Sequence, residues 1–133
     1  MRFRFLIAWL LAALPAWALA PASHERRGNS ITFTLRDGWA KIEWVSASAI
    51  RFCRGWEPPP GCPALADREP VVFTERDEAD VVELRSRDLV VRLESSTGRM
   101  EVATADALKL LQETTVARRV NRDVVVQFQN TSK

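Results

Sequence analysis

Four carboxylates within six residues form the densest group of acidic side chains in the chain. They are Glu75, Asp77, Glu78 and Asp80. Two carboxyl groups about 5 to 5.5 Å apart can act as nucleophile and acid/base in a hydrolytic reaction. The surrounding segment has no glycine-rich or aromatic frame to bury or orient such a pair, and catalytic carboxylates need environments that separate their pKa values. The sequence therefore favours a solvated loop over a catalytic site, and it lacks the spacing of a calcium-binding loop.

Cys53 and Cys62 are the two cysteines, and the eight residues between them are rich in glycine and proline. In an oxidising compartment, a disulfide closing this loop contributes roughly 2.5 to 3 kcal/mol by the chain-entropy estimate. Two sulfurs without a nearby histidine or further cysteine fill only half of a tetrahedral zinc site. We therefore predict a disulfide, with two free buried thiols as the alternative.

His24 is the only histidine, and it lies in a polar segment, residues 23–29, that we expect to be a disordered leader. Acid–base catalysis requires both an acid and a base near the reacting atoms, and a metal site requires several ligands. We therefore predict no catalytic residue, no bound metal and no cofactor. His24 itself is interpreted as solvent-exposed.

The composition is that of one folded domain, with 133 residues of which 47% are hydrophobic and 27% charged. The formal net charge is +2, but Arg2 and Arg4 precede an apolar segment that we expect to be removed. The remaining chain has 17 basic and 17 acidic residues and hence no net charge. A neutral domain gives no electrostatic reason to expect nucleic acid or an anionic membrane as a partner.

Residues 1–22 have the layout of a secretory signal peptide: two arginines, an apolar stretch at 5–14 and a series of small residues. Ten apolar residues span about 15 Å as a helix, half of a hydrocarbon core of about 30 Å, which disfavours a membrane anchor. We predict cleavage after Ala18 or Ala22. The mature protein is then secreted or periplasmic, with no further membrane association.

From Asn29 onward the dominant period of the apolar residues is two, which is the period of a β-strand with one buried face. An Asp37-Gly38 pair supplies a tight turn after the first such run. Strands are expected at 31–35, 40–44, 50–54, 71–73, 81–86, 89–95, 99–104, 114–120 and 124–128, with 108–113 as either a strand or a helical turn. Short strands at this spacing indicate that residues 30–133 form an all-β, antiparallel β-sandwich.

Two stretches of sequence resemble a known family. The run ITFTLRDGWAKIEWV (31–45), followed by AIRF (49–52), is similar to the opening of the N-terminal domain of glycoside hydrolase family 31, the α-glucosidase and α-xylosidase family. In that domain an Asp-Gly hairpin leads to a strand with an Ile-Arg-hydrophobic triplet. The run VELRSRDLVVRL (82–93), then GRMEV (98–102) and LLQE (110–113), resembles its later paired strands.

The resemblance covers about residues 30–129 and implies a galactose-mutarotase-like β-sandwich. In the family this domain precedes a (β/α)8 barrel that carries the catalytic carboxylates, and it lends a loop to the rim of the substrate pocket. The implied partners are therefore the barrel and an α-linked oligosaccharide. A glycine expected in the turn near Asp106 is absent, and no catalytic motif has a matching position. We expect a non-catalytic amino-terminal piece of a truncated or longer enzyme.

Two of the five tryptophans are candidate carbohydrate contacts, because an aromatic ring can stack against a sugar. Trp44 alternates into the predicted core, and two others belong to the signal peptide. Trp39 beside the hairpin turn and Trp56 in the proline-rich loop remain. We expect the loop from Cys53 to Cys62 to be the region that shapes a pocket. Packing of Trp56 on its own sandwich, or a free-standing periplasmic carbohydrate-binding module that uses both rings, are the alternatives.

Overall fold

The computed structural model describes residues 23–56, 62, 65, 68–114, 118–120, 123–125 and 128–130. Every regular element in these residues is a β-strand. Within the same residues, no helix has the length and apolar character needed to cross a membrane. The signal peptide predicted at 1–22 lies outside the described residues, so its presence and cleavage stay predictions.

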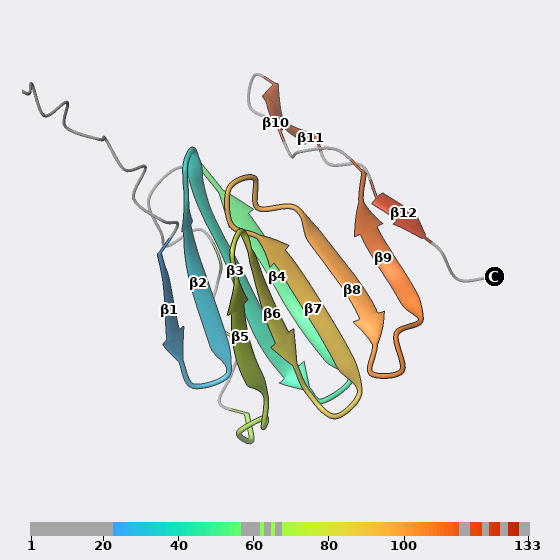
Figure 1. The fold of residues 1–133 in the computed structure, drawn as a ribbon. Helices are drawn as coiled ribbons and strands as arrows, with labels where there is room; N and C mark the ends of the chain where they lie inside the picture. Colours follow the sequence, from blue (N-terminus) through green and yellow to red (C-terminus); the bar gives the residue numbers. More distant parts are fainter. Residues whose placement is uncertain are drawn as a thin grey trace, which may run out of the picture.

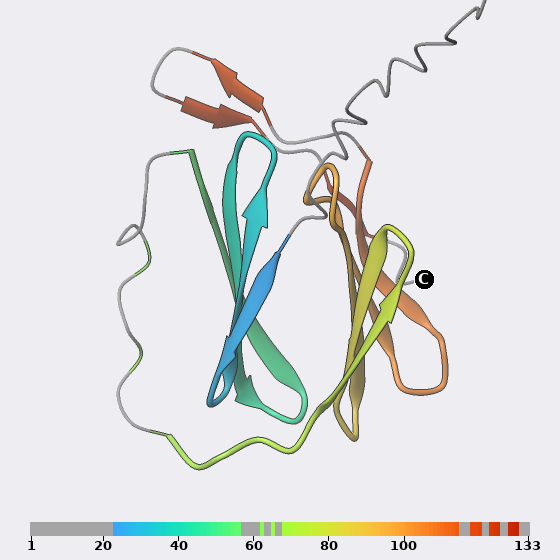
Figure 2. The same cartoon turned by 60° about the vertical axis from the view of Figure 1, so that its left-hand side comes forward.

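The strands form two antiparallel sheets that lie face to face (Figures 1 and 2). The strand bounds are β1 (His24–Arg27), β2 (Ser30–Leu35), β3 (Gly38–Ser46), β4 (Ala49–Gly55), β5 (Thr74–Glu78), β6 (Val81–Arg85), β7 (Leu89–Glu94), β8 (Met100–Thr104), β9 (Lys109–Glu113), β10 (Arg118–Val120), β11 (Asp123–Val125) and β12 (Phe128–Asn130). Sheet A has the order β1-β2-β3-β4, and sheet B has the order β12-β9-β8-β7-β6-β5. Strands β10 and β11 pair with each other as a separate hairpin. The predicted all-β sandwich is confirmed.

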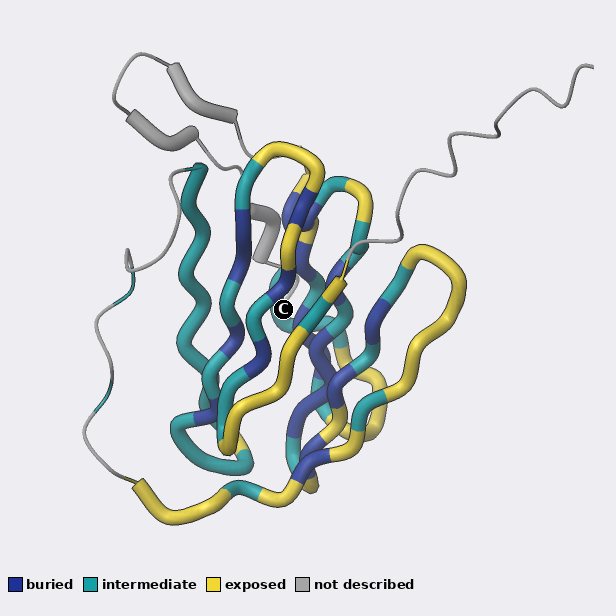
Figure 3. The backbone as a smooth tube through the Cα atoms, turned by 90° about the vertical axis from the view of Figure 1, so that its left-hand side faces the viewer, coloured by how far each residue is buried: buried dark blue, intermediate teal, exposed yellow. Residues whose placement is uncertain are grey.

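The core lies between the two sheets and is built from the alternating apolar positions that the sequence pattern marked. In sheet A, Ile31 of β2 pairs with Ile42 of β3, and both are completely buried. In sheet B, Val91 of β7 lies between Leu84 of β6 and Val102 of β8. The buried positions alternate with more exposed ones along β2 and β6. Figure 3 shows the burial of each described residue along the backbone. Each sheet therefore contributes one apolar face to a shared core.

The polar segment predicted as a disordered leader contains strand β1 instead. The pairing of β1 with β2 runs from His24 opposite Phe33 to Arg27 opposite Ser30, and a turn at Gly28 joins the two strands. Backbone hydrogen bonds to β2 order these residues, and such bonds do not require apolar side chains. The prediction of disorder is wrong here because it rested on side-chain polarity.

Residues 71–73, predicted as a strand, form an irregular connection instead. The side-chain oxygen of Asn29 accepts a hydrogen bond from the backbone N–H of Val71 at 2.8 Å, so a side chain takes the place of a neighbouring strand. Phe73 is buried in the core. The strand begins only at Thr74, in the acidic segment predicted as a loop. This segment can be a strand because it is the edge of sheet B, where charged side chains are tolerated.

The carboxy-terminal part of the chain is divided into shorter strands than the sequence predicts. The ambiguous residues 108–113 contain strand β9, so the helical-turn alternative is wrong. The strands predicted at 114–120 and 124–128 correspond to β10 and β11, each of three residues, and β12 then pairs with β9. Residues 115–117, 121–122 and 126–127 lie outside the described part of the chain.

Ala107 lies in the loop between β8 and β9 with a left-handed backbone, at φ 72°. This is the turn in which the family resemblance predicts a glycine. This conformation costs a residue with a Cβ atom about 1 to 2 kcal/mol, and replacement by glycine removes that strain. Part of the gain is lost, because glycine has more conformational freedom in the unfolded chain. We expect Ala107→Gly to raise the free energy of unfolding by about 0.5 to 1 kcal/mol, measured by urea denaturation. Ala105→Gly, at a position without positive φ, is the control, and an equal gain there would contradict the assignment.

Candidate functional site

The two cysteines and Trp56 lie at the end of strand β4, where the chain leaves sheet A. The structure joins Cys53 to Cys62 in a disulfide with a Cα–Cα distance of 6.0 Å. Residues 57–61 of the loop lie outside the described part of the chain. Oxidation in the cell requires an oxidising compartment, so it depends on the export that the sequence predicts.

Trp56 is a half-buried side chain beside this disulfide. The guanidinium carbon of Arg54 lies 5.6 Å from the centre of its ring, within the range of a cation–π contact. Part of the ring remains accessible. Trp56 is therefore the one of the two predicted carbohydrate contacts whose position still permits stacking against a ligand.

Trp39, the second predicted carbohydrate contact, is buried with only 7% of its surface exposed, which does not fit a ring that stacks against a sugar. It lies opposite Gly55 across strands β3 and β4. A Cβ atom added to Gly55 would lie 2.7 Å from the indole of Trp39, which shows that the ring rests directly on the glycine backbone. Because Gly55 has no side chain, the indole of Trp39 can lie against the sheet instead of projecting into solvent.

The four acidic residues of the densest carboxylate cluster do not converge on one point. Glu75 and Asp77 share a face of β5 and lie near His24. Glu78 pairs with Arg76 at 2.8 Å, and Asp80 accepts hydrogen bonds from the backbone and hydroxyl of a serine in the β7–β8 turn. The segment predicted as a solvated loop is strand β5 and the turn after it, and of its four carboxylates only that of Glu75 is partly buried.

A mainly apolar cleft with a volume of about 510 Å³ opens between β4 and strands β7 to β9. Ile50 and Phe52 line it from β4, and Leu110 and Leu111 line it from β9. All four are only partly buried, although they pack against the core. The two sheets are thus less tightly closed on this side than in the centre, and apolar surface remains accessible.

Two buried charged side chains, Arg54 and Glu113, follow the cleft residues Phe52 and Leu111 on the same faces of β4 and β9. Arg54 pairs across the sheet with the core residue Ala40, and its side chain is 5% exposed, while Glu113 of β9 is 2% exposed. One carboxylate oxygen of Glu113 accepts the backbone N–H of Met100 at 2.6 Å. Its other oxygen and both Nη atoms of Arg54 have no hydrogen-bond partner among the described residues.

The electrostatics of Glu113 are dominated by the removal of its carboxyl group from water. Burial raises the pKa of Glu113, and the hydrogen bond from Met100 and the positive charges of Arg54 and Arg99 oppose that rise only in part. Arg54 also lies 3.9 Å from the exposed carboxylate of Asp37, beyond hydrogen-bond distance. We refer to Ile50, Phe52, Arg54, Leu111 and Glu113 together as the β4–β9 edge.

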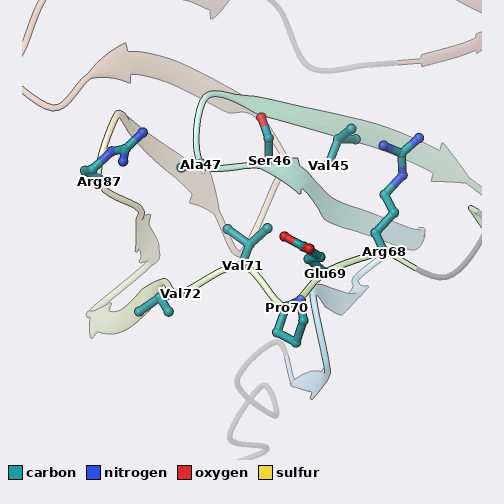
Figure 4. A pocket seen from close by; sticks show the side chains of 9 residues that line it. All are labelled: Val45, Ser46, Ala47, Arg68, Glu69, Pro70, Val71, Val72 and Arg87. Carbon is teal, nitrogen blue, oxygen red and sulfur yellow. The ribbon is translucent and has the colours of Figure 1, made fainter.

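A second hollow of about 510 Å³ lies between the β3–β4 turn and residues 68–72. In Figure 4, Arg68 and Arg87 lie at opposite ends of it and Glu69 lies between them. Its lining, within the described residues, includes no aromatic side chain. The hollow therefore lacks the ring face on which a sugar would stack.

Two solved structures share this architecture. An α-xylosidase of glycoside hydrolase family 31 from Xanthomonas citri superimposes with a TM-score of 0.58 and 19% identity over 80% of this chain. The chain has the fold of a family 31 β-sandwich. An uncharacterised protein from Listeria monocytogenes, crystallised with α-D-glucose, β-D-glucose, magnesium and calcium, superimposes with a TM-score of 0.55 and 25% identity over 71% of this chain.

This family 31 fold is the one that the sequence resemblance predicted. The likeness is detected through structure, since no protein-family profile and no curated protein sequence matches the chain. The matched region spans 13% of the α-xylosidase and 9% of the Listeria protein. The chain therefore corresponds to a small part of each of these larger proteins.

Proposed function

We propose that the chain is the non-catalytic β-sandwich of an exported glycoside hydrolase related to α-glucosidases and α-xylosidases. In this proposal it packs against a catalytic barrel and helps to shape a pocket for an α-linked oligosaccharide. The observation that carries the proposal is the β4–β9 edge, where accessible apolar side chains adjoin charged groups with unpaired polar atoms.

The apolar part of this edge is typical of a surface that another domain covers. Ile50 and Phe52 of β4 face the space between the sheets, and Leu111 faces them from β9. Covering such side chains contributes about 25 cal/mol for each Å² of apolar surface removed from water. A neighbouring domain is thus a favourable occupant of the cleft.

The polar part of the edge supports the same conclusion. A buried donor or acceptor without a partner costs about 1 to 3 kcal/mol, and more when it carries a charge. Arg54 and Glu113 together leave several such atoms among the described residues. A neighbouring domain that supplies a carboxylate or carbonyl would lower this cost if the Arg54 side chain turns outward to meet it.

The carbohydrate-related role is supported by the two solved structures with this fold, one an α-xylosidase and the other bound to glucose. A supporting role is favoured over a catalytic one because the acidic residues of β5 lie at the edge of sheet B, where Asp77 and Glu78 are exposed to solvent. Catalytic carboxylates need environments that separate their pKa values. Export is supported by the signal-peptide pattern of residues 1–22. It would supply the oxidising compartment that the Cys53–Cys62 disulfide requires.

The test begins with the coding sequence downstream of Lys133, where we expect an in-frame continuation or an adjacent gene for a (β/α)8 barrel. We expect that barrel, co-expressed with this chain, to co-purify with it and to hydrolyse 4-nitrophenyl α-glucoside or α-xyloside. Phe52→Asp should reduce co-purification at least tenfold, because a charge in the cleft cannot be covered by apolar surface. Val72→Asp is the matched control, since Val72 is already exposed to solvent and lies outside the cleft.

Three results would contradict this proposal. Hydrolysis by the chain alone would show that it is catalytic. Equal effects of Phe52→Asp and Val72→Asp would show that the cleft is not the interface. An unrelated downstream gene, with no barrel that binds the chain, would remove the partner itself.

A free-standing carbohydrate-binding module is the second candidate, and the partly exposed side chain of Trp56 is the observation that favours it. This candidate requires tryptophan fluorescence to change on addition of millimolar maltose or xylose oligosaccharides. It also requires Trp56→Phe to abolish that change while the buried Trp39 and Trp44 still report a folded protein. No change at millimolar sugar would exclude this role.

A further inference from the structure

Three side chains with metal-binding atoms meet at the side of the sandwich opposite the cleft. His24 belongs to β1, the outermost strand of sheet A, while Glu75 and Asp77 belong to β5, the outermost strand of sheet B. Figure 2 brings these two strands to the front of the view. One ligand atom from each residue lies within 4.8 Å of the other two, and His24 Nε2 is 3.8 Å from Asp77 Oδ1.

The imidazole of His24 is held in place before any ligand binds. Its ring packs against the buried Phe33, with ring centroids 5.6 Å apart, and its Nε2 contacts a carboxylate oxygen of Glu75. The side chain of His24 is only 18% exposed, whereas that of Asp77 is 64% exposed. The cluster is therefore fixed at its inner end and open to solvent at Asp77.

The nearest cation of the same strand is turned away from the cluster. Arg26, two residues after His24, places its guanidinium 3.9 Å from the ring centre of Phe73 and within 3.4 Å of the Phe73 carbonyl. Its charge is thus occupied by a cation–π contact and a carbonyl. The two carboxylates of β5 and the imidazole leave a net negative site when the imidazole is neutral.

We propose that His24, Glu75 and Asp77 bind one divalent transition-metal ion, with Zn²⁺ as the best fit. One imidazole nitrogen and two carboxylate oxygens are ligands that Zn²⁺ accepts, and three protein ligands leave a further position for water. Ca²⁺ and Mg²⁺ prefer a larger set of oxygen ligands and are poorly matched to a site with an imidazole. The sequence indicated no metal because the two carboxylates are more than fifty residues away from the single histidine.

The bound ion would connect the free edges of the two sheets. Strands β1 and β5 belong to different sheets, so their backbones form no ladder with each other. An ion held by both strands stabilises the sandwich because it binds the folded chain and finds no assembled site in the unfolded one. The inference is independent of the proposed function, since it uses no residue of the β4–β9 edge.

The experiment uses the full chain without a polyhistidine tag, freed of metal with a chelator and then titrated with Zn²⁺ by calorimetry. We expect one ion per chain, and a melting temperature raised by several degrees at saturating Zn²⁺. Because His24 is the only histidine, the imidazole ¹⁵N resonances report on it alone, and we expect Zn²⁺ to shift them. Ca²⁺ at the same concentration should produce neither the heat nor the shift.

Variants separate a metal site from a simple His24–Glu75 contact. We expect His24→Gln and Asp77→Asn each to reduce Zn²⁺ affinity at least tenfold, while both proteins remain folded without metal. Glu78→Gln is the matched control, because it removes a carboxylate of the same strand from the other face and should bind Zn²⁺ as the unaltered chain does. Unchanged binding by His24→Gln, unshifted imidazole resonances, or no uptake at about 100 µM Zn²⁺ would each overturn the proposal.

Discussion

Replacing Gly38 by alanine is expected to lower the free energy of unfolding by about 3 kcal/mol or more. Gly38 begins strand β3 with φ 148°, a conformation that residues with a Cβ atom rarely adopt. A Cβ atom built there would lie 2.2 Å from the carbonyl oxygen of Gly55 in the neighbouring strand. The contact is with backbone, so it can be relieved only by separating β3 from β4.

Gly28→Ala is the matched control for this prediction. Gly28 also has positive φ, at 56°, but nothing lies within 4 Å of the position that its Cβ atom would take. Alanine there should cost only the conformational strain, about 1 kcal/mol. Urea denaturation of both variants measures the difference, and a loss in Gly38→Ala no larger than that in Gly28→Ala would contradict the steric argument.

Two substitutions of Glu113 are expected to change the free energy of unfolding in opposite directions at pH 7. Glutamine keeps an oxygen that can accept the N–H of Met100 and removes the charge whose burial raises the pKa of Glu113, so we expect Glu113→Gln to stabilise the chain. Alanine leaves that N–H without an acceptor and opens a cavity. We expect Glu113→Ala to cost about 2 to 3 kcal/mol.

The stabilisation by Glu113→Gln should depend on pH in a defined sense. The pKa of Glu113 in the folded chain lies above its ordinary value of 4.5, so over the interval between the two values the folded chain holds a proton that the unfolded chain has released. The stability of the unaltered chain therefore falls as pH rises through this interval, and the glutamine variant does not share that loss. The difference between the two proteins should be small below about pH 4 and reach its full size above the folded pKa.

Other carboxylates do not disturb this comparison. Hydrogen bonds from Arg99 and then Thr97 lower the pKa of Glu94, and a hydrogen bond from Arg87 lowers the pKa of Asp88. Such groups contribute stability that is lost as pH falls through their folded pKa, which lies below their ordinary value and therefore on the acid side of the interval in which Glu113 titrates. Denaturation curves of the pair across the pH range test the prediction, and a difference that does not vary with pH would refute it.

The central strands of the sandwich could be predicted from the sequence because their side chains report on burial. Ile31 and Phe33 alternate with polar residues in β2, and this alternation survives in the folded sheet. The two edge strands that the prediction missed, β1 and β5, are held mainly by backbone pairing along one side. Their polar sequences carry no periodic apolar signal, so the same physical reason explains both errors.

The candidate sites were harder to predict because they depend on cross-strand neighbours. Trp39 is buried because Gly55 lies opposite it. That pairing depends on the register between β3 and β4, which the local sequence does not determine. Arg54 and Glu113 could have been noticed, because each continues an inward-facing series, after Phe52 and Leu111 respectively. What the pattern could not show is that the two series face each other across the sheets. Likewise, nothing in the sequence brings His24 to β5.

The order of strands within each sheet has a consequence for how the chain folds. In sheet A, and from β5 to β9 in sheet B, every ladder joins strands that are neighbours along the chain. Closing such short loops loses little entropy, so each meander can assemble quickly from local contacts. The slower step is the packing of one meander against the other, in which their apolar faces are removed from water. Changes in the length of the connection between β4 and β5 should therefore alter the rate of folding more than the stability of either ladder.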